Sequence, residues 1–160
     1  MDTTIEVAET VETKEKVTPK DAFKGMITGL FDLASGEKTA DQIQPNFYEW
    51  LPAIDKYIYE RNEEIEYNRG EIPDLSGLES FAHRQPLAVY LKSGGGTTRL
   101  RFRKPTPPTP NSFLLEATDP QNKTEENEVF GKLSQLANET FGAGEEITAE
   151  TSGNQITFRR

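Results

Sequence analysis

The chain of 160 residues contains no cysteine and a single histidine, His83. Without cysteine it forms no disulfide bond, holds no metal through thiolates and has no cysteine nucleophile. One histidine cannot form a histidine cluster for a metal, and no Gly-x-Ser-x-Gly sequence marks a serine nucleophile. We therefore expect no metal, no cofactor and no catalytic residues. The only acid–base groups left for an enzyme are carboxylates and tyrosine.

Long apolar runs are also missing. No stretch of about 18 apolar residues is available to cross a bilayer, and the N-terminus lacks the basic-then-apolar order of a signal peptide. The hydrophobic fraction is only 34%, the mean hydropathy is -0.70, and there are ten prolines. We expect a soluble, cytoplasmic protein with one globular domain and some tail or linker.

Acidic side chains are absent from one stretch of 32 residues, Arg84 to Leu115, which carries six basic ones. Because the whole chain has a formal net charge of -9, the remainder carries -15. Residues 1–17 are rich in Thr, Glu and Val without a helical stripe, which predicts a flexible acidic arm. Residues 18–160 then form a single domain, with a stiff proline-rich connector at 104–111.

Within the acid-free stretch, Pro86 to Lys104 has the pattern of a β-hairpin around three consecutive glycines. If Lys92 faces Thr97, one face is apolar and holds Leu87, Val89, Leu91, Leu100 and Phe102. The opposite face carries the candidate partner-binding residues Tyr90, Lys92, Arg99, Arg101 and Arg103. Both strands support the same register, which strengthens the prediction of a hairpin.

A row of arginines beside a tyrosine fits three interpretations. The side chains can be solvated or paired with the chain's own carboxylates, they can bind an acidic protein partner, or they can contact nucleic acid through phosphates and bases. A sequence pI near 4.7 argues against the third, because the overall field repels a phosphate backbone. An acidic partner, inside the chain or on a neighbouring subunit, is the simpler expectation.

Two helices are expected before the hairpin. Thr18-Pro19 starts the first and Gly36 ends it, while the second runs from about residue 46 to 68 and begins or kinks near Pro52. Its later half carries Glu60, Glu63, Glu64 and Glu66. This acidic row is interpreted as a solvated face, as the internal partner of the arginines, or as a mimic of nucleic acid. Sharing of a cation by Glu60 and Glu64 is less favoured, because nothing marks further ligands.

After a short helix over 78–83 and the first hairpin, we expect a third strand over 112–117, a helix over 124–141 and a second hairpin around Ser152-Gly153. Pairing Thr151 with Asn154 sets Ala149 against Ile156, Ile147 against Phe158, and Glu146 against Arg159. The predicted class is α+β: two N-terminal helices, then an antiparallel sheet of about five strands, made of two hairpins plus one strand, with one packed helix.

The leading functional hypothesis is a non-enzymatic protein–protein interaction or assembly protein, such as an accessory or structural subunit of a larger complex or particle. One alternative is a nucleic-acid-binding module that uses the arginine-lined hairpin face. Another is an acidic inhibitor that mimics nucleic acid through its glutamates. Each hypothesis implies a macromolecular partner and no membrane, and the sequence leaves the oligomeric state open.

Overall fold

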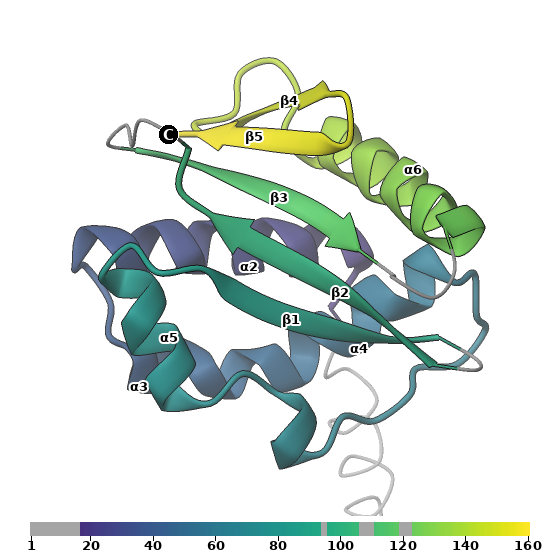
Figure 1. The fold of residues 1–160 in the computed structure, drawn as a ribbon, viewed down its shortest axis with the longest axis horizontal. Coiled ribbons are helices and arrows are strands. Elements are labelled where there is room, and N and C mark those ends of the chain that lie inside the picture. Colours follow the sequence, from purple (N-terminus) through teal and green to yellow (C-terminus); the bar gives the residue numbers. More distant parts are fainter. Residues whose placement is uncertain (1–16, 94–95, 106–110, 119–122) are drawn as a thin grey trace, which may run out of the picture.

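A computed structural model of the chain describes residues 17–93, 96–105, 111–118 and 123–160 (Figure 1). Residues 1–16 of the expected acidic arm and 106–110 of the expected connector lie outside the described residues. The elements in chain order are α2 (Pro19–Ser35), α3 (Ala40–Ile43), the 3-10 turn η1 (Gln44–Asn46), α4 (Phe47–Ile58), the 3-10 turn η2 (Arg69–Glu71), α5 (Leu75–Ala82), β1 (Leu87–Ser93), β2 (Gly96–Arg103), β3 (Ser112–Thr118), α6 (Lys123–Thr140), β4 (Thr148–Ser152) and β5 (Gln155–Arg159).

The strands form one antiparallel sheet in the order β1-β2-β3-β5-β4, and this confirms the predicted α+β class. Figure 1 shows α2 and α4 behind the sheet, with α6 beside its β5–β4 end. The core lies between the sheet and these helices. There the ring of Phe158 is 5.9 Å from Phe23 of α2 and 5.7 Å from Phe141 after α6, measured between centroids. Among the described residues, none of the helices combines the length and apolar character that a bilayer crossing requires.

Helix α2 begins and ends as the sequence predicts. The Thr18 hydroxyl accepts a hydrogen bond from the backbone N–H of Asp21 at 3.1 Å, and Gly36 closes the helix with a left-handed φ of 86°. The packing of α2 on α4 depends on a feature the sequence analysis missed. A Cβ atom placed on Gly25 would lie 2.7 Å from Nε1 of Trp50, so only glycine lets the indole approach this closely.

The first hairpin has the predicted register, with Lys92 opposite Thr97 and Val89 opposite Leu100. The predicted register of the second hairpin was wrong by two residues. Ala149 was expected to face Ile156, but it faces Phe158.

The slip in the second hairpin arises at its turn. The two central positions are Gly153 and Asn154 rather than Ser152 and Gly153, and Gly153 has a φ of 61°. Glycine at the first central position is typical of a type II′ turn. Because a slip of two preserves the alternation, Ile156 and Phe158 still face the core, while Arg159 lies opposite Thr148 instead of Glu146.

The second predicted helix is too long by ten residues. Helix α4 ends at Ile58, and the chain then leaves the helical path because Glu60 adopts a left-handed φ of 52°. The side chain of Arg61 turns back and forms an ion pair with Asp55 inside α4. The glutamates after residue 59 therefore lie in an irregular segment, so they do not form the helical row that the sequence predicted.

The start of the second helix agrees with the prediction of about residue 46, since α4 begins at Phe47 directly after the 3-10 turn and Pro52 lies inside it. One further boundary differs from expectation. Helix α5 begins at Leu75 rather than near residue 78, because the Asp74 carboxylate accepts the backbone N–H of Gly77 at 2.7 Å and caps the helix there.

Candidate functional site

One face of the sheet points away from the helices, and none of the described helices covers it (Figure 1). We call it the outer face; its side chains of interest are Tyr90, Lys92, Arg99, Arg101, Arg103, Leu114, Glu116, Thr118, Glu150, Gln155, Thr157 and Arg159. The five residues singled out from the sequence all lie on this face, because their neighbours Val89, Leu100 and Phe102 alternate into the core and are at most 1% exposed.

Glu116 of β3 is the carboxylate at the centre of the arginine row. Arg103 donates to it from Nε at 3.2 Å and from Nη2 at 3.3 Å, and Nη1 of Arg101 lies 3.5 Å from Oε1. Gln155 of β5 donates a further hydrogen bond at 2.9 Å. Burial by itself would raise the pKa of Glu116, but these donors and charges hold the pKa below its usual value. Part of the arginine row is thus paired inside the chain.

Arg99 and Tyr90 remain open to solvent. They lie opposite each other on β2 and β1, and 45% of Tyr90 is exposed. Nε of Arg99 donates to the hydroxyl of Thr118 at 3.0 Å, but within the described ranges its guanidinium has no carboxylate partner. This pair presents a cation beside an aromatic ring at the accessible end of the row.

Lys92 is occupied by other contacts, although it shares the face. Its Nζ lies 2.9 Å from the carboxylate of Glu71, 3.0 Å from the carbonyl oxygen of Glu66 and 5.1 Å from the ring centre of Tyr67. These contacts tie Lys92 to the segment that precedes α5. Lys92 therefore stabilises the fold at the β1 edge. Unlike Arg99, it is already paired with a carboxylate of the chain.

The outer face has more positive than negative charge. It carries five cations, namely Lys92, Arg99, Arg101, Arg103 and Arg159, against the two carboxylates Glu116 and Glu150. Because Glu71 pairs with Lys92 from outside the face, the excess that remains is two positive charges. The sequence analysis identified β3 but assigned it no neighbour in the sheet, so it missed Glu116 and Gln155, and it paired Arg159 with Glu146 instead of Glu150. Arg159 pairs with Glu150 at 3.5 Å, across a highly exposed surface where such pairs contribute little.

An apolar side chain lies beside the charged row. Leu114, opposite Arg103 on β3, is 8% exposed and lies at the base of a pocket of about 450 Å³. Pro105, Thr157 and Arg159 form part of its walls. An apolar centre with a polar and cationic rim is the usual composition of a protein-docking surface.

Beneath the β1 edge lies a buried ion pair between Asp55 of α4 and Arg61. Asp55 is 0% exposed, and Arg61 also donates to the backbone carbonyl of Lys92. Burial raises the pKa of Asp55 to about 6, against the opposing effect of the Arg61 charge. Burial and the nearby Asp55 charge also raise the pKa of Tyr67. This network holds the segment after α4 against the sheet.

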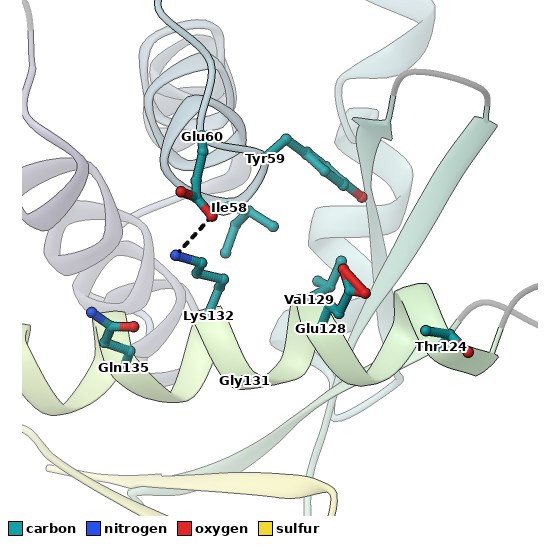
Figure 2. Close-up of a pocket in the computed structure, with 9 residues that line it drawn as sticks. All are labelled: Ile58, Tyr59, Glu60, Thr124, Glu128, Val129, Gly131, Lys132 and Gln135. Atoms are coloured by element: carbon teal, nitrogen blue, oxygen red, sulfur yellow. Dashed lines mark ion pairs between the residues drawn. The ribbon is translucent and has the colours of Figure 1, made fainter.

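A second hollow lies between the end of α4 and helix α6. Figure 2 shows Lys132 reaching from α6 toward Glu60, with the two charged atoms 3.0 Å apart, and Tyr59 lying above Glu128 and Thr124. The hollow has a volume of about 540 Å³ and an apolar floor that includes Ile58 and Val129. The Tyr59 hydroxyl is hydrogen-bonded to Thr98 of β2 at 2.8 Å, so the tyrosine is fixed in place.

The chemistry of this hollow is limited to ion pairing and apolar contact. Its charged groups are Glu60, Glu128 and Lys132, with Gln135 as an amide. In the parts of the chain that the structure describes, no group of three or more His, Cys, Asp or Glu residues is arranged to hold a metal ion.

Comparison with protein-family models, with curated proteins and with solved structures gave no match to this chain.

Proposed function

We propose that the protein is a non-enzymatic binding or assembly protein whose outer sheet face docks an acidic segment of a protein partner. The observation that carries this proposal is the excess of two positive charges, counted after the Lys92–Glu71 ion pair, on one uncovered face of a chain with a net charge of -9. Because the rest of the chain carries an excess of negative charge, long-range electrostatic attraction favours the approach of an acidic partner to this face.

Arg99 and Tyr90 make the first contact with the partner in this proposal. Arg99 has no competing carboxylate among the described residues, and its planar guanidinium can receive a partner carboxylate through two parallel hydrogen bonds. Tyr90 supplies an exposed ring with a polar tip. The pocket over Leu114 then takes an apolar side chain of the same partner, next to Arg103.

Nucleic acid remains the competing candidate, and two observations weigh against it. Glu116 already takes up much of the charge of Arg101 and Arg103, and Tyr90 is the single aromatic side chain on the described outer face. Proteins that bind single strands commonly offer several stacking rings along a basic groove. The pI near 4.7 adds long-range repulsion of phosphates.

The test uses two charge reversals of equal size. Arg99→Glu changes the outer face, and Lys20→Glu makes the same change at an exposed position of α2. The wild type and both variants are used for affinity purification from native cells, and each protein that depends on Arg99 is purified and titrated by calorimetry. We expect Arg99→Glu to weaken the affinity for the purified partner about tenfold, and Lys20→Glu to leave this affinity unchanged. Glu116→Gln, which releases Arg101 and Arg103, should strengthen it.

The proposal is wrong if Arg99→Glu and Lys20→Glu retain the same purified partner with the same affinity. It is also wrong if labelled oligonucleotides bind the wild type with a steep salt dependence and Arg99→Glu removes that binding. Each phosphate contact lowers the slope of log K against log salt by about 0.9, so a slope near zero excludes nucleic acid as the occupant of the face.

A further inference from the structure

Three cationic side chains from separate parts of the chain meet in a small pocket beside the end of α2. Arg84 comes from the turn after α5, Lys104 from the residue after β2, and Arg160 from the residue after β5. The pocket has a volume of about 220 Å³, and Phe31 of α2 forms part of its apolar wall. Arg160 also lines the pocket over Leu114, whereas Arg84 and Lys104 do not, and none of the three cations is among the outer-face side chains named above.

The charge of this pocket is only partly balanced. Arg160 donates to the carboxylate of Asp32 at 2.7 Å, and the same carboxylate lies 3.9 Å from Nζ of Lys38. Lys104 donates to the backbone carbonyl oxygen of Ser112 at 3.1 Å, which brings no negative charge. Within the described ranges, neither Arg84 nor Lys104 has a carboxylate partner. The half-buried Lys104 and the exposed Arg84 therefore line the same pocket without a carboxylate between them.

The pKa of Lys104 reflects the missing counter-charge. This pKa is lowered, first by burial and then by the positive charge of Arg84. An arrangement that places two like charges together and withdraws one of them from water costs free energy in the empty protein. An anion bound between the two side chains would offset the repulsion between their charges and compensate Lys104 for its lost contact with water.

The backbone holds two pocket residues in an uncommon conformation. Arg84 has a φ of 72° and Asn111 has a φ of 65°, both in the left-handed region. For a side chain such as arginine this region costs on the order of 1–2 kcal/mol relative to the right-handed one. The carbonyl oxygen of Asn111 accepts the backbone N–H of Arg160 at 2.9 Å, which ties two walls of the pocket together. The fold thus keeps the cations together at some cost.

We propose that this pocket binds a phosphate group, either as inorganic phosphate or as the end of a small phosphomonoester. A phosphate carries about -1.5 to -2 charges at neutral pH, which matches the two uncompensated cations. Its oxygens point in tetrahedral directions, and the donors come from three separate segments instead of one planar fork, which a carboxylate would prefer. A volume of about 220 Å³ is below that of common pockets for drug-sized ligands, so a single phosphate fits and a nucleotide does not.

The proposal is independent of the function proposed above and is tested on the full chain. Thermal midpoints and calorimetric titrations are measured with sodium phosphate, glycerol 3-phosphate, sodium acetate and sodium chloride at matched ionic strength. Three variants are compared with the wild type: Arg84→Gly, Lys104→Met and the exposed control Lys20→Gln. Glycine adopts the left-handed conformation of residue 84 without strain, so Arg84→Gly removes the charge and keeps the turn.

We expect a saturable rise in the thermal midpoint with phosphate or glycerol 3-phosphate, and no such rise with acetate or chloride. Tighter binding of glycerol 3-phosphate would assign the site to a phosphomonoester, and tighter binding of phosphate would assign it to the free anion. Arg84→Gly and Lys104→Met should each weaken binding about tenfold, while Lys20→Gln leaves it unchanged. If Lys104→Met does not fold, Arg84→Gly alone decides.

Three results would overturn the proposal. The first is the absence of a saturable effect of either phosphate compound, and the second is an equally strong effect of acetate. The third is phosphate binding that Arg84→Gly leaves unchanged, because the anion would then lie elsewhere on the protein.

Discussion

Replacing the buried Asp55 by asparagine should remove a specific pH dependence of stability. The Asp55 carboxylate is 0% exposed, and burial raises its pKa from 3.8 to about 6 in spite of the Arg61 charge. The folded protein therefore holds this proton more tightly than the unfolded chain. The contribution of Asp55 to the free energy of unfolding is largest near pH 4, falls as the pH rises to 6, and is constant above that.

The size of this contribution follows from the pKa difference. Each pKa unit corresponds to about 1.4 kcal/mol, so a rise of about two units gives about 3 kcal/mol over the whole titration, of which about 2 kcal/mol falls between pH 4 and pH 6. Other carboxylates change stability in the same pH range with the opposite sign. Glu71 and Glu116 have lowered pKa values, so they stabilise the fold less as the pH falls. These groups are present in both proteins and cancel in the difference between the wild type and Asp55→Asn.

The assay is urea unfolding followed by far-ultraviolet circular dichroism at several pH values from 4 to 7 and at constant ionic strength. We expect the wild type to lose stability relative to Asp55→Asn by about 2 kcal/mol as the pH rises from 4 to 6. If the difference in stability between the wild type and Asp55→Asn does not change with pH, the argument is refuted, because Asp55 would then have the same pKa in the folded and unfolded states. A difference of opposite sign would show that attraction to Arg61 outweighs burial.

Two further predictions each compare a pair of equal substitutions. Gly25→Ala should lower stability by about 1–2 kcal/mol, since its Cβ would lie 2.7 Å from the Trp50 indole, whereas Gly131→Ala on the open side of α6 should raise it by up to about 1 kcal/mol through helix propensity. Thermal unfolding of both variants decides this, and equal signs would contradict it. Tyr57→Phe should leave stability unchanged or raise it, because its buried hydroxyl has no hydrogen-bond partner among the described residues, whereas Tyr59→Phe should cost about 1 kcal/mol by removing a 2.8 Å hydrogen bond. Chemical denaturation measures both, and a larger loss for Tyr57→Phe would contradict the assignment.

The first hairpin was predictable in detail because two strands had to agree on one register. Shifting the pairing by one residue would have moved Leu100 and Phe102 out of the core and the three arginines of β2 into it. Alternation excludes a shift of one in both hairpins but permits a slip of two, so the position of the turn has to decide. In the first hairpin the pairing of Lys92 with Thr97 was predicted correctly, whereas in the second the turn was placed one residue too early. A slip of two residues keeps Ile156 and Phe158 buried, so alternation cannot separate the two registers, and the turn at Gly153 decides.

The end of α4 and the pairing of the arginines depend on contacts between distant segments. Local periodicity continued past Ile58, but the chain turns where Arg61 reaches back to Asp55 and across to β1. In the same way, the carboxylate that neutralises Arg101 and Arg103 lies on β3 rather than in the acidic segment after α4. An excess of glutamates in a sequence does not show which of them is placed opposite a cation.

The cationic pocket could not be inferred from the sequence. Arg84 and Lys104 lie within the acid-free stretch, but Arg160 is more than fifty residues further along the chain. Only the order of the strands, which places β5 beside β3, brings these segments to the same end of the fold.

The contact between Trp50 and the glycines of α2 also equips the protein with an internal optical reporter. Trp50 is the only tryptophan of the chain, and its ring is held between α2 and Phe47, with 5.1 Å between the ring centres. Helices α2 and α4 lie behind the sheet, on the side opposite the outer face (Figure 1). We therefore expect its fluorescence to report the separation of these two helices and to be insensitive to any ligand added to the outer face, so that unfolding of the helical layer can be measured separately from the binding proposed above.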